Sequence, residues 1–431
     1  MVGSDYFTAG AHAVGIPTGG GAALASLDPD IAPLEQLKTD GTGWLPQSAT
    51  GTVANTVYIN PGAELPGIGT QERPFSSWYD VAWAPGTAYL QLGGSVSTTP
   101  LIVTGVGTAQ SPILIGSYGG GAAMIASMVA FDNASHVALV GVTVAGSPLA
   151  GIMIANGSNY IEIAGDTVAY STEGINIADG AGSDDLIVGN TIASNVYFGI
   201  GVTDISHGAA DQSVIAGNLI IGNGSHGIEL DGNWFTVENN LIYGNGMTMP
   251  GSSGIHVYAT SATQGAGLHN TLRYNILMAN RDSQAQDGNG IELDQWTADN
   301  QVIGNLTTAN DGAGIELYDS SNNLVQDNTM IGDSLDEGHT HAERGETGMG
   351  SAFAVSLSTG NVFNDNTAIS LSPNASAILI DTATPTASMT IGNNIFINYA
   401  GGPVFSWAGV VGTDLATWNS KPKGGVDSFT L

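Results

Sequence analysis

The sequence contains no cysteine, few basic residues and no long apolar run, and each absence excludes a class of protein. Without cysteine there is no disulfide framework, no thiol nucleophile and no thiolate metal site. With 7 Lys and Arg against 38 Asp and Glu, the formal net charge is -31, which repels nucleic acids and anionic membranes. No apolar run reaches the roughly 18 residues that span a bilayer. We therefore expect no nucleic-acid partner and no membrane partner.

The residues that are present are mostly small and apolar. Of 431 residues, 62 are glycine, 42% are hydrophobic and only 10% are charged. Disordered acidic tails have far more charge and fewer apolar residues, so this composition predicts a folded protein with an ample core. The N-terminus lacks the basic segment and the apolar stretch of a signal peptide.

One repeat runs from about residue 120 to residue 400. Its first half is a Gly-Ile pair followed by alternating apolar positions, which predicts a strand with one buried face. Seven copies begin at Gly151, Gly174, Gly199, Gly227, Gly254, Gly290 and Gly314. We expect later strands of the same series at residues 353–355 and 378–380.

The second half of the repeat centres on an asparagine between apolar positions. The copies are Asn190, Asn218, Asn240, Asn275, Asn305, Asn328, Asn366 and Asn394, and a second asparagine often follows five residues later. An inward asparagine at a bend can bond its counterpart in the next coil and so satisfy a buried amide. We interpret these asparagines as scaffold.

Short strands in constant register, without a helical period, predict an all-β solenoid in which each coil buries its apolar face on its neighbours. We expect a single right-handed parallel β-helix over residues 76–405. Residues 1–75 are interpreted as an N-terminal extension or cap and residues 406–431 as a C-terminal capping tail, because an open solenoid end is a bare strand edge.

The Gly-Ile strands and asparagine ladders resemble the right-handed parallel β-helix (pectin-lyase-like) superfamily, which includes pectate lyases, polygalacturonases, alginate lyases and alginate epimerases. Residues 69–75, 89–94 and 111–119 look like the first segment of secreted β-helix carbohydrate enzymes. The resemblance covers about residues 80–405. It implies a secreted or cell-surface protein with a polysaccharide or oligosaccharide substrate.

Chemically active residues concentrate in four consecutive coils. In the predicted register, the residue between Ile and the next apolar position points outward, as does the residue two further on. These two columns read Glu229, His256, Glu292 and Glu316, and Asp231, Tyr258, Asp294 and Tyr318. Five carboxylates then share a patch of roughly 15 Å, which needs a proton or a cation to relieve repulsion. Except for the tyrosines, we take these residues as catalytic candidates; a solvated acidic strand face is the alternative.

Aromatic residues border this patch. Trp234 and Trp296 each follow an outward aspartate in a turn, and indole faces suit the C–H faces of sugar rings. We expect them to bind substrate together with Tyr258, Tyr318 and Arg281, which can approach from a turn. The alternative for each tryptophan is that it packs its own turn.

The paired carboxylates favour a glycoside hydrolase, or a glycosyl-transferring glycosidase, which requires no cofactor. Adjacent Glu292 and Glu316 should lie about 5 Å apart, the retaining separation. Glu229 and Glu292, two coils apart, should lie about 9.5 Å apart, near the inverting limit.

Two other functions stay open. The resemblance to alginate epimerases implies a lyase or uronan C5-epimerase that uses His256 and Tyr258, with calcium at Glu229, Glu292 and Glu316. The columns carry no Lys or Arg to neutralise a substrate carboxylate, so we expect a neutral glycan, or calcium dependence on an acidic one. The third function is a glycan-binding adhesin without catalysis.

Overall fold

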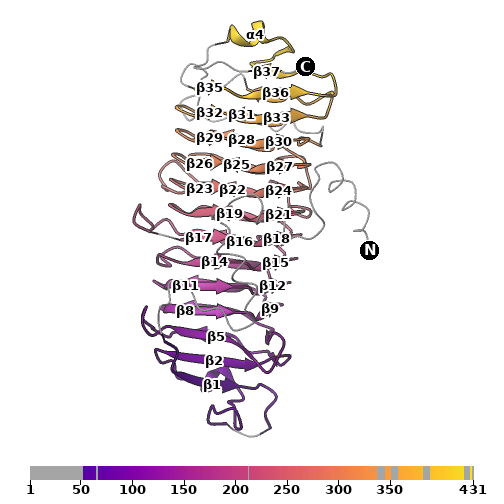
Figure 1. Cartoon of the computed structure of the whole chain (residues 1–431). Helices are drawn as coiled ribbons and strands as arrows, with labels where there is room; N and C mark the ends of the chain where they lie inside the picture. The colour runs from indigo at the N-terminus through magenta and orange to yellow at the C-terminus, as the bar shows by residue number, and fades with distance from the viewer. Residues whose placement is uncertain are drawn as a thin grey trace. The chain divides into compact units, whose positions relative to one another are not determined.

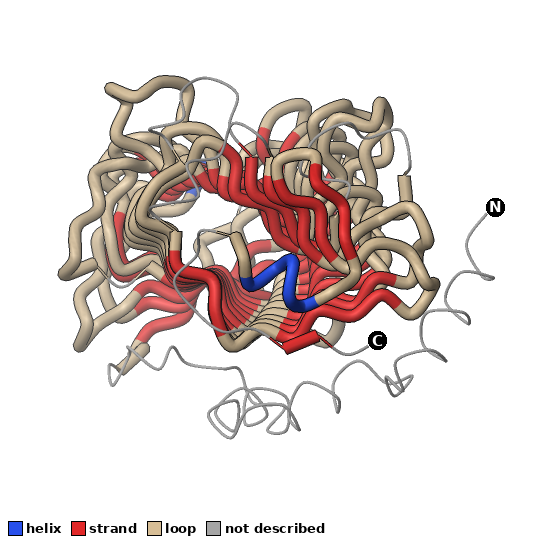
Figure 2. Tube along the Cα trace, turned by 90° about the horizontal axis from the view of Figure 1, so that it is seen from above, coloured by secondary structure: helices blue, strands red, loops and turns tan. Residues whose placement is uncertain are grey.

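The computed structural model describes residues 52–64, 67–211, 213–336, 345–350, 358–381, 389–421 and 428–429. In this part the chain winds as a parallel β-helix whose successive coils add strands to three 13-stranded sheets (Figure 1). Seen along the axis, the strands of successive coils superpose on three faces around a central core (Figure 2). The predicted all-β solenoid is confirmed.

The sheets follow one another along the chain in the order A, B, C within each central coil. Sheet A consists of β1 Asn55–Ile59, β2 Thr87–Leu92, β5 Ile113–Tyr118, β8 Ser135–Val140, β11 Asn159–Ala164, β14 Leu186–Val188, β17 Val214–Ala216, β20 Thr236–Glu238, β23 Thr271–Arg273, β26 Gln301–Ile303, β29 Leu324–Gln326, β32 Val362–Asn364 and β35 Thr390–Gly392. Sheet B consists of β3 Val96–Ser97, β6 Met124–Ile125, β9 Thr143–Ala145, β12 Thr167–Ala169, β15 Thr191–Ala193, β18 Leu219–Ile221, β21 Leu241–Tyr243, β24 Ile276–Met278, β27 Leu306–Thr308, β30 Thr329–Ile331, β33 Thr367–Ser370, β36 Ile395–Asn398 and β39 Ser428–Phe429.

Sheet C consists of β4 Leu101–Val103, β7 Val129–Asp132, β10 Ala150–Ala155, β13 Glu173–Ile177, β16 Ile200–Val202, β19 Ile228–Leu230, β22 Ile255–Val257, β25 Ile291–Leu293, β28 Ile315–Tyr318, β31 Thr347–Gly350, β34 Ile378–Ile380, β37 Phe405–Trp407 and β38 Val410–Gly412. The described helices are the 3-10 turn η2 Trp78–Asp80 and α4 Leu415–Asn419. Among the described strands, all pairs are parallel except β37 with β38.

The core is a stack of aliphatic side chains that point inward from the three sheets. On sheet C, Ile228 pairs with Ile255 and Leu230 pairs with Val257, and all four side chains are fully buried. The residues between them therefore face outward, because side chains alternate along a strand. The Gly-Ile repeat thus forms the strands that the sequence predicts.

Each bend between sheets A and B from Asn190 to Asn394 combines one left-handed residue with an inward asparagine. At the bend between sheets A and B, Asn239 has a φ of 56° and precedes Asn240. The side-chain amide of Asn240 donates to Asn275 Oδ1 at 3.0 Å and to the Ile215 carbonyl at 2.9 Å, so its N–H groups are satisfied. This is the predicted asparagine ladder.

The bend between sheets C and A carries a further ladder that the sequence analysis did not identify. Its members are Asn270, Asn300, Asn323 and Asn361, which bond one another in successive coils. Each precedes an asparagine of the first ladder by five residues, so the spacing itself is the signal that could have revealed them.

The boundaries of the solenoid differ from the expected domain limits. Strand pairing begins with β1, inside the expected N-terminal extension 1–75, whose first 51 residues lie outside the described residues. Within the expected tail 406–431, Trp418 of α4 is fully buried against Phe396, Phe405 and Trp407 of the last coils.

The coil after β28 corrects one expectation. We expected residues 353–355 to continue the column after Glu316. The residue that pairs with Glu316 in the next coil is instead Gly348 of β31. Buried Thr347 takes the place of the isoleucine and buried Met349 that of the next apolar residue, so this strand lacks the Gly-Ile pair. Residues 351–357 lie outside the described part. Residues 378–380 form β34, as predicted.

Candidate active site

The outer face of sheet C brings the first predicted column together in adjoining coils. Glu229 pairs in register with His256, His256 with Glu292, and Glu292 with Glu316. Their exposed fractions are only 9%, 8%, 3% and 0%, although they point away from the core. Such burial does not fit a solvated acidic strand face. It means that charges in this cluster are balanced locally, because buried ions are costly unless they are paired.

His256 is held between two carboxylates through both ring nitrogens. Its Nδ1 lies 2.8 Å from Glu229 Oε2, and its Nε2 lies 3.3 Å from Asp294 Oδ2. Burial alone would lower the His256 pKa, but the charges of Glu229 and Glu292 and these hydrogen bonds raise it well above its usual value. His256 is therefore an imidazolium that donates in both directions.

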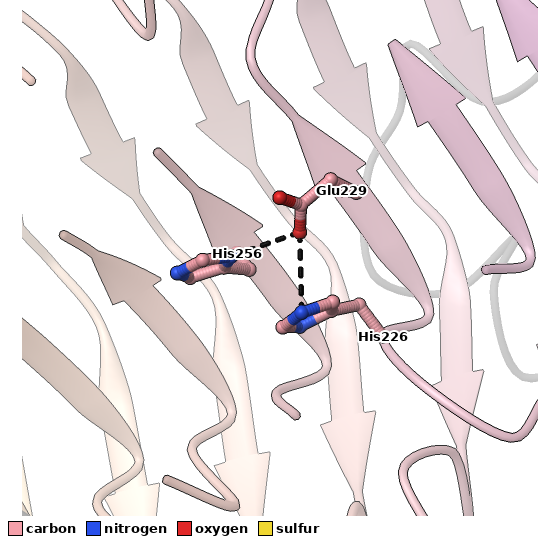
Figure 3. Close-up of side chains that lie close together, drawn as sticks. All are labelled: His226, Glu229 and His256. Atoms are coloured by element: carbon pink, nitrogen blue, oxygen red, sulfur yellow. Dashed lines mark hydrogen bonds and ion pairs between the residues drawn. The ribbon is translucent and has the colours of Figure 1, made fainter. Parts of the chain in front are cut away.

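A second histidine, His226, approaches Glu229 from the bend before β19 (Figure 3). Its Nε2 lies 3.2 Å from Glu229 Oε2, and the backbone N–H of Ser253 donates to its Nδ1 at 2.9 Å. Burial lowers its pKa to about 4, with the charge of Glu229 opposing the shift. His226 is therefore neutral, and it stacks on His256 with ring centroids 4.5 Å apart.

Two acids of one strand differ sharply in protonation. Burial would raise the Glu229 pKa, but His256 and His226 outweigh it and lower the pKa to about 2. Burial and the Glu229 charge raise the pKa of Asp231 to about 8. Glu229 is ionised near neutral pH, whereas half-buried Asp231 keeps its proton.

The deeper acids each accept a hydrogen bond from a side chain of the preceding coil. Ser253 Oγ donates to Glu292 Oε2 at 2.7 Å, and Asn289 Nδ2 donates to Glu316 Oε2 at 2.8 Å. Burial raises the Glu292 pKa to about 7. The loop before β25 adds Asp287, whose pKa burial and the Glu292 charge raise well above its usual value. Asp287 lies outside the repeat and was not predicted from the sequence.

The sequence analysis also missed a third outward column. Phe198, His226, Ser253 and Asn289 each stand directly before the glycine of a Gly-Ile strand, and the last three bond the acids of the site. Glycine is required beside them because a Cβ on Gly254 would lie 2.6 Å from the Gly290 carbonyl oxygen. In the sequence, this column could have been found by reading the residue directly before each glycine of the Gly-Ile repeat.

The second predicted column forms the outer rim of the site. Tyr258 stacks on His256 with centroids 5.3 Å apart, and burial and Asp294 raise its pKa. Asp294 is buried, and its Oδ1 has no hydrogen-bond partner among the described residues. Tyr318 ends β28 and is half-buried.

The expected sugar-binding residues are only partly brought to this rim. Half-buried Trp234 follows Asp231 in its turn, and one face of its indole is covered by His269 at 4.2 Å. Trp296 lies in the turn after Asp294, where its backbone is left-handed with a φ of 62°. Arg281 donates to Asp311 Oδ1 at 2.6 Å and to the Ala309 carbonyl at 2.9 Å, and these bonds do not join it to the cluster.

The donor set does not favour the expected calcium site. Calcium prefers six to eight oxygen ligands. One oxygen of each expected ligand, Glu229, Glu292 and Glu316, already accepts a hydrogen bond from a protein donor. The close donor groups also include His256 nitrogens, which are engaged with carboxylates. Calcium dependence stays a prediction, and no step below uses a metal.

Solved structures with this architecture include the A-modules of two mannuronan C-5 epimerases of Azotobacter vinelandii, AlgE4 and AlgE6. The AlgE4 module is 15% identical with a TM-score of 0.55, covering 81% of this chain and 99% of that one. The AlgE6 module is 14% identical with a TM-score of 0.53, covering 80% and 91%. A rhamnogalacturonan lyase is 14% identical with a TM-score of 0.50, covering 79% and 87%. At these identities the likeness shows the fold alone.

Sequence comparisons add the family. No curated protein matches this chain. Both helical elements of the described part, η2 and α4, are too short to cross a bilayer. The family model described as right handed beta helix region matches residues 127–307 and 263–415. Because these matches span most of the solenoid, the chain belongs to the right-handed β-helix family.

Proposed function

We propose that this protein is a glycoside hydrolase that acts on a polysaccharide or oligosaccharide, with Asp231 as the proton donor and Asp294 as the second carboxylate. The observation that carries the proposal is the position of His256, bonded through one ring nitrogen to Glu229 and through the other to Asp294. This arrangement holds the Asp294 carboxyl group on the same face as Asp231, whose raised pKa keeps it protonated, and glycoside hydrolysis requires a proton donor and a second carboxyl group.

Asp231 suits the role of general acid. It is half-buried beside ionised Glu229, and its pKa of about 8 keeps it protonated near neutral pH. A protonated carboxyl can deliver its proton to the leaving glycosidic oxygen. Once the proton is transferred, the site holds an additional negative charge, which His256 partly offsets from its position between Glu229 and Asp294.

Asp294 suits the role of the opposing carboxylate. The His256 imidazolium fixes its Oδ2, while its Oδ1 is buried and has no hydrogen-bond partner among the described residues, so Oδ1 is the proposed acceptor for a proton of the attacking water. Asp231 and Asp294 follow strands two coils apart, hence roughly 9.5 Å at the backbone. The retaining and inverting ranges apply to the carboxyl groups, and a two-coil backbone spacing favours the inverting range over the retaining one, so we expect inversion at the anomeric carbon.

β-Elimination or epimerisation has weaker support. Both reactions need a base for the C5 proton. His256 is protonated with both nitrogens engaged, and Tyr258 has a raised pKa, so neither is a ready base. The fold is shared with epimerase modules and a lyase, but it does not identify a reaction.

The cluster favours a neutral glycan as substrate. In the described part of sheet C, the outward columns carry acids, aromatics and no Lys or Arg, so a polyuronate would meet like charge. We further propose that the protein acts outside the cell, where most polysaccharide substrates are found.

A polysaccharide panel tests the proposal. Reducing ends should appear without the absorbance of unsaturated uronates, and NMR of the first products should show the inverted anomer. Unsaturated products would replace hydrolysis with elimination. Epimerised uronates without chain cleavage would identify an epimerase, and binding without any product would identify an adhesin.

A further inference from the structure

We propose that His226 is a positioning residue of this site: its neutral ring keeps Glu229 ionised, and Glu229 in turn holds His256 as the cation that orients Asp294. The proposal rests on the proposed function for its kinetic consequences, but its charge states can be measured without turnover. It concerns a residue that does not reach the reacting atoms.

The hydrogen bonds of His226 define its tautomer. A backbone N–H can only donate, so the 2.9 Å contact from the Ser253 N–H requires a lone pair on His226 Nδ1. The single proton of the neutral ring is then on Nε2, which lies 3.2 Å from Glu229 Oε2. Glu229 therefore accepts from two imidazoles at one oxygen, His226 Nε2–H and His256 Nδ1–H.

Packing confines the ring to this role. On one side His226 stacks on His256 at 4.5 Å with planes 8° apart, and on the other side it stacks on Phe198 at 5.8 Å. The side chain is buried, so water does not compete for its nitrogens. Rotation of the ring would break both hydrogen bonds, and the neutral Nε2–H form is fixed in place.

The consequence passes along a chain of hydrogen bonds. Two imidazole donors, together with a hydrogen bond from Asp231, stabilise the Glu229 carboxylate, whose charge favours the imidazolium of His256. That imidazolium donates to Asp294 Oδ2 and leaves Oδ1 without a hydrogen-bond partner among the described residues. Without the His226 donor, Glu229 would bind a proton more readily and His256 would lose its proton at a lower pH.

The other titratable groups that face this pair come from three elements. Asp231 follows β19 beside Glu229, Tyr258 follows β22 on the His256 ring, and Glu292 and Asp294 approach from β25 and its end. The loop before β25 adds Asp282, which faces His226, and Asp287, which faces the His256 and Glu292 pair. None of these groups donates to Glu229 through an imidazole. The effect of His226 on the His256 pKa can therefore be measured separately from theirs.

The first experiment uses the unaltered protein. Nitrogen-15 NMR of the histidine rings, followed from about pH 5 to about pH 8, should show His226 as a neutral Nε2–H tautomer throughout and His256 as protonated. Titration of His226 within this range, or an Nδ1–H tautomer, would overturn the proposal. Because no substitution is involved, a variant that fails to fold cannot leave the question undecided.

The second experiment compares two variants. His226→Phe keeps the ring stack but removes the donor to Glu229, so the His256 pKa should fall by about one unit or more. Because Glu229 would then bind a proton at a higher pH and His256 would lose its proton at a lower pH, the pH range over which kcat/KM is high should narrow on both its acidic and its basic side. His226→Gln can accept from the Ser253 N–H and donate to Glu229, and should restore the His256 pKa and the pH profile.

His136→Phe is the matched control, because His136 also stacks on an aromatic ring, Tyr160 at 4.4 Å, but lies outside the site. It should leave the His256 titration unchanged. An unchanged His256 pKa in folded His226→Phe would contradict the proposal. If no glycan is cleaved at all, the proposed function fails while the NMR result still decides the role of His226.

Discussion

The rings of His226 and His256 lie parallel, 4.5 Å apart and within 8°, yet they carry different charges. Burial keeps the His226 pKa near 4, whereas carboxylates on both sides raise that of His256 well above its usual value. A cation thus rests on the face of a neutral aromatic ring, which is a favourable contact. The different surroundings of two identical side chains determine the charge pattern of the whole site.

Asp231→Asn and Asp294→Asn should each lower kcat by about two orders of magnitude or more, the usual cost of losing a general acid or base. Asparagine keeps the shape and removes the titratable group, so circular dichroism should be unchanged. Asp327→Asn is the control, because Asp327 is an exposed bend residue with a φ of 57°, a conformation that asparagine also adopts. Near-normal turnover in either site variant would refute that residue's role.

Glu292→Gln should fold and should lower turnover by less than either aspartate variant, because it removes a charge that helps to hold His256 as an imidazolium. A glutamine oxygen can still accept the hydrogen bond that Ser253 Oγ donates to Glu292 at 2.7 Å. What disappears is a proton-binding group with a pKa of about 7 beside His256 and Asp294. Steady-state kinetics on a substrate that the parent cleaves would check this, and full activity would place Glu292 outside the chemistry.

The protein should be more stable at about pH 5 than at about pH 8. Burial raises the pKa of Glu162 to about 8 and of Asp333 to about 7, and it also raises the pKa of Asp166, Asp185 and Glu346. A carboxyl group whose pKa is higher in the folded than in the unfolded protein stabilises the fold when it is protonated. This contribution is complete below the pKa of the unfolded state and is lost as the pH rises through the pKa of the folded state. Calorimetry at constant ionic strength should show Tm falling by several degrees over this range. A rising Tm would contradict the expectation.

Asp333→Asn provides a matched test of that pH dependence. Asp333 Oδ1 accepts from the backbone N and from Nδ2 of Asn310, at 3.0 and 2.8 Å, as asparagines do elsewhere in the ladder. Asparagine retains this acceptor and does not titrate. The variant should therefore match the parent at about pH 5, exceed its Tm at about pH 8 and show a flatter profile between them.

Activity on a neutral glycan should survive a chelator, and a polyuronate should not be cleaved without calcium. The two arginines of the described central coils are already paired, Arg273 with Glu238 and Arg281 with Asp311, each at 2.6 Å. Neither is free to neutralise a substrate carboxylate. The measurement is turnover on neutral and uronate polymers with and without chelator. Strong chelator-resistant cleavage of a polyuronate would reverse the substrate assignment and favour elimination.

The strands and the two outward columns follow from the sequence because their periodicity is local. Alternation along a strand and a constant register place Glu229 beside His256 and His256 beside Glu292, as predicted. The strand at β31 was missed because Met349 replaces the usual aliphatic residue and no Gly-Ile pair marks it. Periodic reasoning fails where a single coil departs from the common pattern.

The charges of the site do not follow from the same periodicity. They depend on burial, and burial depends on bends and loops whose direction no repeat describes. His226 and Ser253 reach the acids from the residue before a glycine, and Asp287 arrives from a loop. Arg281 was expected near substrate, but Asp311 of the next coil holds its guanidinium. Sequence gives the column of an acid, whereas the surrounding side chains decide whether it carries a proton.

Because the coils stack at a fixed spacing, the number of coils between two residues sets the distance between them. Asp231 and Asp294 follow strands separated by one intervening strand, which carries His256. Neighbouring strands lie roughly 4.8 Å apart, so duplicating or deleting a coil between the acids changes their spacing by that whole increment. Recombination of coils could therefore move such an enzyme in one step between the separations typical of inverting and retaining glycosidases, whereas point mutations could only adjust it around the value that the coil number sets.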